Sequence, residues 1–352
     1  MKRQAITAYG KPLEEITGEV APPQGTEVLL KVIHCGVCHS DVHLHDGYFD
    51  LGDDKKLDIS GAHKLPFTLG HEIEGVVVAL GPEASGANIG DRRVIFPWIG
   101  CGDCPVCTRG DEQLCNTPRA LGVNIDGGYA DHVIVPHVRY LLDFDGIPEG
   151  LAATYMCSGL TAYGALKKVL PLEAGQTLAI VGLGGVGFMG LQFAKAMFPE
   201  ATVIGVDIND ETLNAASDAG AERVYNSSDP DAAKRVIKES SGGVAAAIDF
   251  VGAESSLNFA QRIAAKGGKV VVVGLFGGKF SMSIPMFPLR ELAILGSYVG
   301  SLTDAIELLD LVKAGGVVPI PIEKRPLEQA GQTLDDLRHG KIVGRVVLEC
   351  SN

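Results

Sequence analysis

The sequence lacks the features that mark membrane and secreted proteins. It has no run of about 18 apolar residues, so no membrane span is expected. The N-terminal MKRQAITAYG leads into polar and proline-rich sequence rather than into the apolar segment of a signal peptide. Lysine and arginine together (30 residues) are outnumbered by aspartate and glutamate (43 residues), so the formal net charge is −13. This negative charge argues against a nucleic acid partner. We therefore expect a cytoplasmic protein with no membrane or nucleic acid partner.

What is present is an ordinary soluble composition. Hydrophobic residues make up 46% and charged residues 21% of 352 residues, a length that suffices for two domains with cores of their own. Eight cysteines in a cytosolic chain are better explained as metal ligands or free thiols than as disulfides.

Four cysteines lie close together in the spacing Cys101-x2-Cys104-x2-Cys107-x7-Cys115. Glycines and a proline in the same segment bend the chain so that the sulfurs can converge. Four thiolates arranged in this way predict a closed, structural zinc site. The loop has few apolar residues of its own, so the free energy of metal binding would contribute to its folding.

A glycine-rich turn follows the apolar run Leu178–Val181 and precedes an amphipathic helical pattern. It fits G-x-G-x-x-G, and the residues expected to contact a dinucleotide are Gly182, Gly184, Gly185, Val186 and Gly187. The N-terminus of the helix would offer N–H groups to the phosphates. Asp207 ends the next apolar run, twenty residues beyond Gly187, where a carboxylate would bind the adenosine ribose hydroxyls. Its neighbours Ile208 and Asn209 offer no cation for a 2′-phosphate, so we predict NAD rather than NADP.

The periodicity of the chain changes near Ala152. Before it, short apolar runs between turns predict a compact β-rich domain. After it, strands alternate with helical patterns, which predicts an α/β domain with a doubly wound parallel sheet. Its expected strands are Leu178–Val181, Thr202–Val206, Ala246–Phe250, Lys269–Val273 and Leu292–Leu295. The final stretch looks like the first domain resuming. The expected boundaries are 1–155, 156–299 and 300–352, with the four-cysteine lobe at about 98–116.

Three further candidate metal ligands are far apart in the sequence: Cys38, His71 and Cys157. Two thiolates and one imidazole make a three-ligand zinc site with an open fourth position, which is the catalytic pattern. Taken singly, each residue has an ordinary explanation, because buried free cysteines are common and most histidines are not ligands. Sequence spacing alone does not bring the three together.

The sequence resembles the zinc-dependent medium-chain alcohol dehydrogenase family over nearly its whole length. The resemblance rests on GVCHSD at Gly36–Asp41, GHEIEG at Gly70–Gly75, the four-cysteine lobe, Cys157, the glycine turn with Asp207, and KIVGRVVL at Lys341–Leu348. It implies a GroES-like β-rich catalytic domain, formed by the first part of the chain and its C-terminal end. It also implies a Rossmann domain between them and two zinc ions per chain, one catalytic at the three dispersed ligands and one structural.

The resemblance also implies roles for residues around the catalytic zinc. Asp41 would orient His71 by a hydrogen bond, and Glu72 would stand close to the metal. Ser40 would contact the substrate oxygen and begin a proton relay that passes through the ribose to His43. The cofactor would be contacted by His39 and Arg345 at the pyrophosphate and by Leu275 beside the nicotinamide. Trp98 would line the substrate pocket, although simple packing would also explain it.

The sequence departs from the family pattern between Cys38 and His71, where it is longer than in most relatives. The extra residues fall in Gly47–Leu65. One interpretation is a lid over the substrate pocket, with Tyr48, Phe49 and His63 as its lining. The other, slightly favoured, is a solvated surface loop.

The function expected from the resemblance is reversible hydride transfer between NAD and a primary or secondary alcohol, aromatic ones included, giving an aldehyde or ketone. A homo-oligomer is expected, a tetramer more than a dimer. One alternative is a zinc-free reductase of enones or quinones with the same fold, which would not need the three dispersed ligands together. Another is a catalytically silent scaffold that binds NAD and zinc, against which the Ser40 and His43 pair argues.

Overall fold

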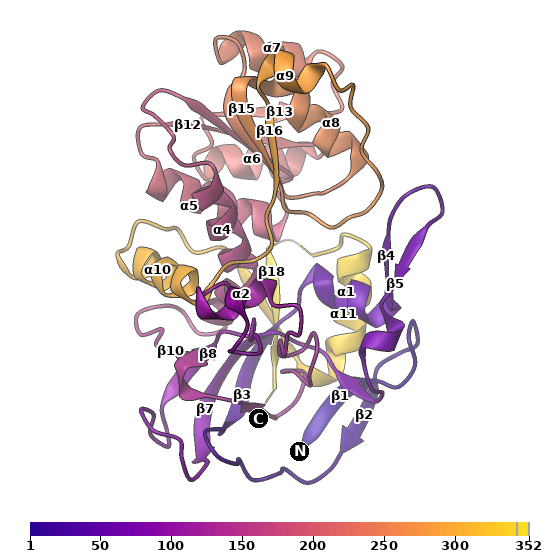
Figure 1. Ribbon diagram of the computed structural model, residues 1–352, viewed down its shortest axis with the longest axis vertical. Helices are drawn as coiled ribbons and strands as arrows, with labels where there is room; N and C mark the ends of the chain where they lie inside the picture. Colours follow the sequence, from indigo (N-terminus) through magenta and orange to yellow (C-terminus); the bar gives the residue numbers. More distant parts are fainter. Residues whose placement is uncertain (343, 351–352) are drawn as a thin grey trace. The chain divides into compact units, whose positions relative to one another are not determined.

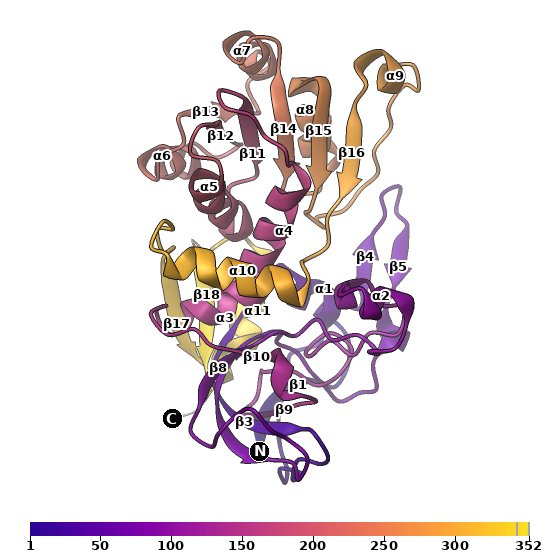
Figure 2. The same ribbon diagram turned by 60° about the vertical axis from the view of Figure 1, so that its left-hand side comes forward.

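The computed structural model describes residues 1–342 and 344–350, so Val343 of the KIVGRVVL motif lies outside the described residues. The chain divides into two compact units. Unit 1 comprises Met1–Tyr48, Asp58–Leu160 and Gly300–Asn352, and unit 2 comprises Phe49–Leu57 and Thr161–Val299. Figures 1 and 2 label most of the helices and strands of each unit.

Unit 1 is built on two sheets. The larger has the strand order β10-β8-β7-β3-β18-β17, with β9 also paired to β3. Its strands are β3 (Val28–Gly36), β7 (Glu72–Leu80), β8 (Arg92–Ile95), β9 (His132–Val135), β10 (Leu141–Leu142), β17 (Ile322–Pro326) and β18 (Arg345–Glu349). The smaller sheet has the order β2-β1-β6, with β1 (Lys2–Ile6), β2 (Glu14–Thr17) and β6 (Phe67–Thr68). Leu30 and Val32 of β3 and Ile73 and Val77 of β7 are buried in the core of this unit.

The C-terminal end of the chain completes the larger sheet. β18 pairs antiparallel with β3 (Figure 1). Val347 lies opposite Gly36 and Leu348 opposite Cys35. Unit 1 also holds the helices α1 (His39–Asp46), α2 (Pro105–Thr108), α3 (Leu151–Thr154), α10 (Leu302–Lys313) and α11 (Ala330–Arg338). Short helical turns are η1 (Ser60–Ala62), η2 (Glu112–Leu114), η3 (Val138–Tyr140), η4 (Tyr155–Gly159) and η5 (Leu327–Gln329).

Unit 2 is a parallel sheet with helices. Its strands run in the order β13-β12-β11-β14-β15-β16, and every pairing is parallel. They are β11 (Thr177–Val181), β12 (Thr202–Asp207), β13 (Arg223–Asn226), β14 (Val244–Asp249), β15 (Ala264–Val272) and β16 (Ala293–Gly296). The helices are α4 (Leu160–Lys168), α5 (Gly185–Met197), α6 (Asp210–Asp218), α7 (Ala232–Glu239), α8 (Glu254–Ile263) and α9 (Met286–Arg290). The order reverses between β11 and β14, which is the topology of a dinucleotide-binding sheet.

Burial explains why these segments form a parallel sheet. All five residues of β11 are buried, because helices cover both faces of such a sheet. Helix α8 buries Phe259, Ala260 and Ile263, which join strand residues such as Val244 and Val270 in one core cluster. The predicted α/β class with a doubly wound parallel sheet is confirmed.

The extra segment Gly47–Leu65 contains a hairpin rather than an irregular loop. Its strands are β4 (Tyr48–Asp50) and β5 (Lys56–Asp58), which form a two-stranded sheet of their own. The tip contacts other residues of unit 2, where Asp53 Oδ2 lies 2.5 Å from Lys279 Nζ. His63 contacts Tyr9 Oη at 3.0 Å and the Val123 carbonyl at 2.6 Å, so its ring is held by contacts within unit 1.

Candidate active site

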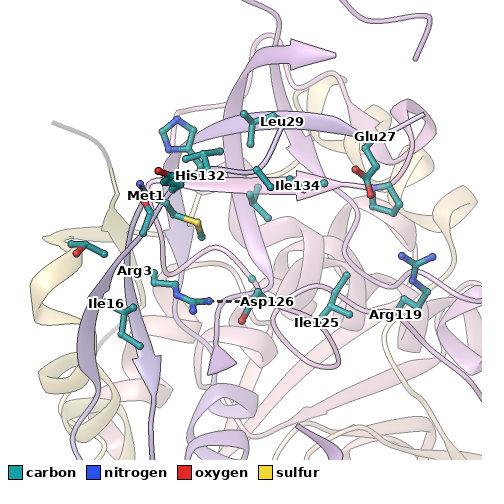
Figure 3. A pocket seen from close by; sticks show the side chains of 18 residues that line it. Met1, Arg3, Ile16, Glu27, Leu29, Arg119, Ile125, Asp126, His132 and Ile134 are labelled. Atoms are coloured by element: carbon teal, nitrogen blue, oxygen red, sulfur yellow. Dashed lines mark hydrogen bonds and ion pairs between the residues drawn. The ribbon is translucent and has the colours of Figure 1, made fainter. Parts of the chain in front are cut away.

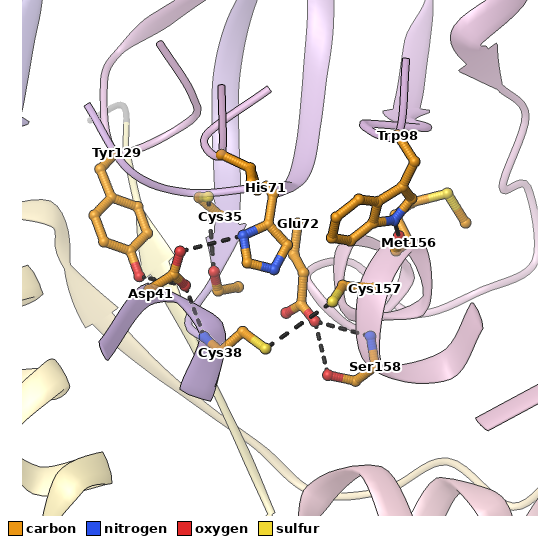
Figure 4. Close-up of polar contacts among 12 residues, drawn as sticks. Cys35, Cys38, Asp41, His71, Glu72, Trp98, Tyr129, Met156, Cys157 and Ser158 are labelled. Atoms are coloured by element: carbon orange, nitrogen blue, oxygen red, sulfur yellow. Dashed lines mark hydrogen bonds and ion pairs between the residues drawn. The ribbon is translucent and has the colours of Figure 1, made fainter. Parts of the chain in front are cut away.

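Three elements of unit 1 bring the dispersed ligands together. Cys38 precedes α1, His71 precedes β7, and Cys157 lies on η4, a π-helical turn of the kind that often marks functional sites. Their ligand atoms all lie within 4.8 Å of one another, and all three residues are buried (Figure 4). The structure therefore assembles the three residues that sequence spacing alone could not connect.

The cluster fits a zinc ion. The Sγ atoms of Cys38 and Cys157 are 4.0 Å apart, near the separation of roughly 3.8 Å for two sulfurs on one tetrahedral zinc. His71 Nε2 is buried and has no hydrogen-bond partner within residues 1–342 and 344–350. A hydrogen bond from Cys157 and the nearby His71 hold the pKa of the Cys38 thiol well below its usual value despite burial. A thiolate is the form that binds metal.

The carboxylate of Asp41 lies beside the His71 imidazole. Its Oδ1 lies 3.2 Å from His71 Nδ1, a close contact that falls short of hydrogen-bond geometry. Its Oδ2 accepts hydrogen bonds from the Cys38 backbone N–H at 2.9 Å and from the Tyr129 hydroxyl at 3.0 Å (Figure 4). The carboxylate is fully buried, so these contacts fix its orientation.

Glu72 is the second buried acid of the cluster. It accepts hydrogen bonds from the Ser158 backbone N–H at 3.1 Å and from Ser158 Oγ at 2.8 Å. Arg345 Nη2 donates to its other oxygen. Burial raises the pKa of Glu72 to about 7, although the positive charge of Arg345 opposes this rise. Glu72 therefore links β7, η4 and β18 beside the three ligands.

The remaining expected site residues of unit 1 lie as follows. Trp98 is buried, its ring centroid is 5.4 Å from that of His71, and its Nε1–H donates to the Met156 carbonyl at 2.9 Å.

Ser40 and His43 lie three residues apart on α1 and so share one helix face. Partial burial, followed by the charge of nearby His39, lowers the pKa of His43, so His43 is neutral and can accept a proton at neutral pH.

The four-cysteine lobe also fits a zinc ion. All four sulfurs lie within 4.8 Å of one another. Cys115 Sγ accepts the backbone N–H groups of Cys101 and Thr117, each at 3.4 Å, and these contacts lower the pKa of its thiol to about 6. A Cβ on Gly100 would overlap Cys107 Sγ, so only glycine fits beside the sulfurs.

The glycine turn of unit 2 has the form that the sequence predicted. Gly182 has φ +84° and lies after β11, and a Cβ on Gly187 would overlap the Gly182 carbonyl oxygen. A Cβ on Gly184 would meet no heavy atom within 4 Å in the described part of the chain, so space is left there for a phosphate. Asp207 ends β12, and its Oδ2 accepts the Leu183 N–H at 2.7 Å. Leu275 is half exposed after β15.

Comparison with known proteins decides the family. Residues 24–146 match the alcohol dehydrogenase GroES-like domain, and residues 185–314 match the zinc-binding dehydrogenase domain. An NAD-dependent alcohol dehydrogenase of Saccharolobus solfataricus is 42% identical over 351 residues, and one of Sulfurisphaera tokodaii is 40% identical over 350 residues; each comparison covers 99% of both chains. The chain belongs to the zinc-dependent medium-chain alcohol dehydrogenase family.

A solved structure agrees with this membership. The crystal structure of the alcohol dehydrogenase from Aeropyrum pernix has a TM-score of 0.88 and 30% identity, covering 99% of this chain and 100% of that chain. The expected GroES-like fold of unit 1 is thereby confirmed.

Two residues of the dehydrogenase site escaped the sequence analysis. Tyr129 and Ser158 each contact an acid beside the ligands, at sequence separations of 88 and 86 residues. No local spacing pattern connects them to the site. For Ser158, its place next to Cys157 is the one signal that the sequence offered.

A separate cavity of about 480 Å³ lies elsewhere in unit 1 (Figure 3). Apolar side chains such as Ile16, Leu29 and Ile134 line it together with charged residues. Arg3 is paired with Asp126 at 2.9 Å beside this cavity. Since its charges are of both signs, the cavity does not point to one class of ligand.

Proposed function

We infer that the protein is a zinc- and NAD-dependent alcohol dehydrogenase, which transfers hydride reversibly between an alcohol and NAD to give an aldehyde or a ketone. The observation that carries this inference is the buried cluster of Cys38, His71 and Cys157. Two thiolates and an imidazole leave the fourth position of a tetrahedral zinc for a substrate oxygen. The full-length similarity to NAD-dependent alcohol dehydrogenases agrees with this chemistry.

Each zinc would have its own set of protein ligands. Cys38, His71 and Cys157 would hold the catalytic ion, and the four-cysteine lobe would hold the structural one. Bound zinc at the first site supplies a Lewis acid that polarises an alcohol or carbonyl oxygen. Asp41 orients His71, and Glu72 places a carboxylate beside the ligands.

Proton transfer is proposed to begin at Ser40. Its hydroxyl would accept the proton of the substrate alcohol, and His43 would receive it through the cofactor ribose. The lowered pKa of His43 supports this role, because a neutral imidazole can take up a proton at neutral pH.

The cofactor NAD would bind to the glycine turn of unit 2. The N–H groups at the start of α5 and the open space at Gly184 suit a pyrophosphate, and Asp207 suits ribose hydroxyls. The other turn contacts would come from Gly182, Gly185, Val186 and Gly187, with Leu275 beside the nicotinamide. His39 and Arg345 are proposed to contact the pyrophosphate.

The substrate is proposed to be a primary or secondary alcohol, including aromatic ones. Trp98 supports an apolar lining, because its buried indole lies against the His71 ring. Tyr48, half-buried in β4, is the second proposed pocket residue.

We also propose a cytoplasmic homo-oligomer, a tetramer or else a dimer. Its support is an apolar surface at β16, the last strand of the sheet in unit 2. Phe276, Ile284 and Leu289, in the segment that leads to this strand, are 73%, 80% and 69% exposed. Among residues 1–342 and 344–350, no helix has the length and apolar character that crossing a membrane requires.

An activity panel tests the function. NADH formation would be measured with aliphatic, benzylic and secondary alcohols and with diols at saturating NAD, in parallel with NADP, before and after chelator treatment. We expect chelator-sensitive turnover with NAD. Alcohol turnover that persists after loss of the catalytic zinc would contradict the role of this ion. Oxidation of NADH by an enone or quinone that does not need zinc, with no turnover of any alcohol, would favour the zinc-free reductase. A protein with two zinc ions and no turnover on any alcohol or carbonyl would favour the scaffold.

A further inference from the structure

We propose that Tyr129 is a positioning residue of the catalytic metal site, which fixes Asp41 so that Asp41 in turn holds His71 in its ligand orientation. The inference rests on the proposed function only in taking Cys38, His71 and Cys157 as the zinc ligands. It concerns a residue that does not itself reach the metal.

The two carboxylate oxygens of Asp41 have different partners. Oδ2 accepts both the Tyr129 hydroxyl at 3.0 Å and the Cys38 N–H at 2.9 Å. Oδ1 therefore remains for His71 Nδ1, at 3.2 Å. Two donors on one oxygen set the rotation of the carboxylate, and this rotation decides whether Oδ1 faces the imidazole. A metal-bound histidine depends on such a partner for its tautomer and ring orientation.

The Tyr129 ring also packs against the segment that carries the same histidine. A Cβ on Gly70, the residue before His71, would overlap the ring of Tyr129. The backbone of this region is tied as well, because Tyr129 N donates to the Leu69 carbonyl at 2.9 Å and Gly128 N donates to the Gly70 carbonyl at 2.7 Å. Tyr129 thus connects the segment that carries Cys38 and Asp41 to the segment that carries His71.

The Tyr129 hydroxyl keeps its proton and therefore remains a hydrogen-bond donor to Asp41. Tyr129 is fully buried, and burial, followed by the charge of Asp41, raises the pKa of its hydroxyl. Without this donor, the fully buried Asp41 Oδ2 would keep one hydrogen bond, from the Cys38 N–H. A buried charged acceptor that loses a donor is destabilised, so the carboxylate would turn or shift away from His71.

The test is Tyr129→Phe in the full-length protein, with the affinity of each zinc site measured by chelator competition. The ring and its packing on Gly70 remain, and only the donor is lost. We expect the affinity of the catalytic site to fall about 10- to 100-fold, the range for partners of metal-bound histidines. The four-cysteine site serves as an internal reference and should be unchanged. Cobalt bound at the catalytic site should also show an altered d–d spectrum.

Tyr225→Phe is the matched control. Its hydroxyl donates to Glu239 at 2.7 Å in unit 2, which holds none of the seven ligands, so the variant loses the same kind of hydrogen bond without touching either metal site. Both zinc affinities should stay at the wild-type level.

A double-mutant cycle separates positioning from general destabilisation. In the Asp41→Ala background no carboxylate remains to be positioned, so Tyr129→Phe should cause little further loss of zinc affinity. An equal loss in both backgrounds overturns the inference, as does unchanged catalytic-site affinity in Tyr129→Phe alone. If Tyr129→Phe does not fold, replacement of Tyr129 by p-aminophenylalanine keeps a donor and should retain near-wild-type affinity; a 10-fold loss there counts against the inference.

Different experimental results would contradict the proposed function and the role of Tyr129. Wild-type protein that binds zinc only at the four cysteines contradicts the proposed function. Wild-type protein with two zinc ions, together with a Tyr129→Phe variant that binds both equally well, contradicts only the role of Tyr129.

Discussion

Gly184 and Gly187 stand three residues apart in one turn, yet different constraints act on them. A Cβ on Gly187 would overlap the Gly182 carbonyl oxygen, whereas a Cβ on Gly184 would meet no described atom within 4 Å. We predict that Gly187→Ala lowers the free energy of unfolding by about 1–3 kcal/mol through overpacking. Gly184→Ala should leave stability within about 0.5 kcal/mol but weaken NAD binding, because its methyl group would occupy the space left for the pyrophosphate.

Thermal denaturation of the free protein and NAD titration would be run on both variants. Equal loss of stability in the two variants would contradict the separation. So would unchanged NAD affinity in Gly184→Ala.

Ser40 is expected to act in proton transfer and not in metal binding. Ser40→Ala should lower kcat by about 10²- to 10⁴-fold, the usual range for a group that transfers a proton in the transition state. Zinc content should remain at two ions per chain, since the three ligands are untouched. Turnover and metal content would be measured together, with Ser217→Ala on the exposed face of α6 as a control. Loss of zinc in Ser40→Ala would count against the relay.

At the scale of elements, we expect the tip of the β4–β5 hairpin to tolerate substitution. Its tip is exposed, and its ion pair between Asp53 and Lys279 is solvent-accessible on both sides. Such pairs contribute only about 0–1 kcal/mol. We predict that replacing Asp53–Lys55 by Asn-Gly leaves zinc content, melting temperature and the relative kcat/KM values of different alcohols unchanged. Altered selectivity among alcohols would instead identify the hairpin as a lid.

Sequence patterns predicted the elements whose burial is regular. Helix α5 occupies the helical pattern expected after the glycine turn, and the five expected strands of unit 2 correspond to β11, β12, β14, β15 and β16. β13 and β17 were not predicted. Both are outer strands of their sheets, and Ile322–Pro326 in β17 reads IEKRP, which has little apolar content. Outer strands of this kind depend on pairing with a neighbour, which periodicity does not record.

Among the residues of the candidate site, those within one short segment could be predicted from the sequence, and those brought together by the fold could not. Local spacing sufficed for the four-cysteine lobe and the glycine turn, since each is contained in one short segment. Cys38, His71 and Cys157 required the family resemblance, because the fold and not the spacing brings them together. Tyr129 and Ser158 were missed because their contacts with Asp41 and Glu72 depend on packing between distant segments.

At the scale of the whole molecule, β16 leaves one edge of the unit 2 sheet without a neighbouring strand among the described residues. Leu295 on this strand is 37% exposed, and Tyr298 just beyond it is 46% exposed. An exposed, apolar outer strand is a template for pairing with a second chain. We therefore expect two copies to associate through β16, which would cover this surface.

Leu295→Glu tests that association, because a carboxylate placed in an apolar interface would lose its hydration without a partner. We predict that the variant has a lower mass in solution than the wild type, down to the 36.9 kDa single chain if the wild type is a dimer. Ile237→Glu is the control, since Ile237 is 36% exposed on α7, which follows β13 at the opposite edge of the sheet from β16. Mass would be measured by light scattering during size exclusion. A wild-type protein that is already monomeric would contradict the proposed assembly, whereas an unchanged oligomer in Leu295→Glu would place the interface on another surface.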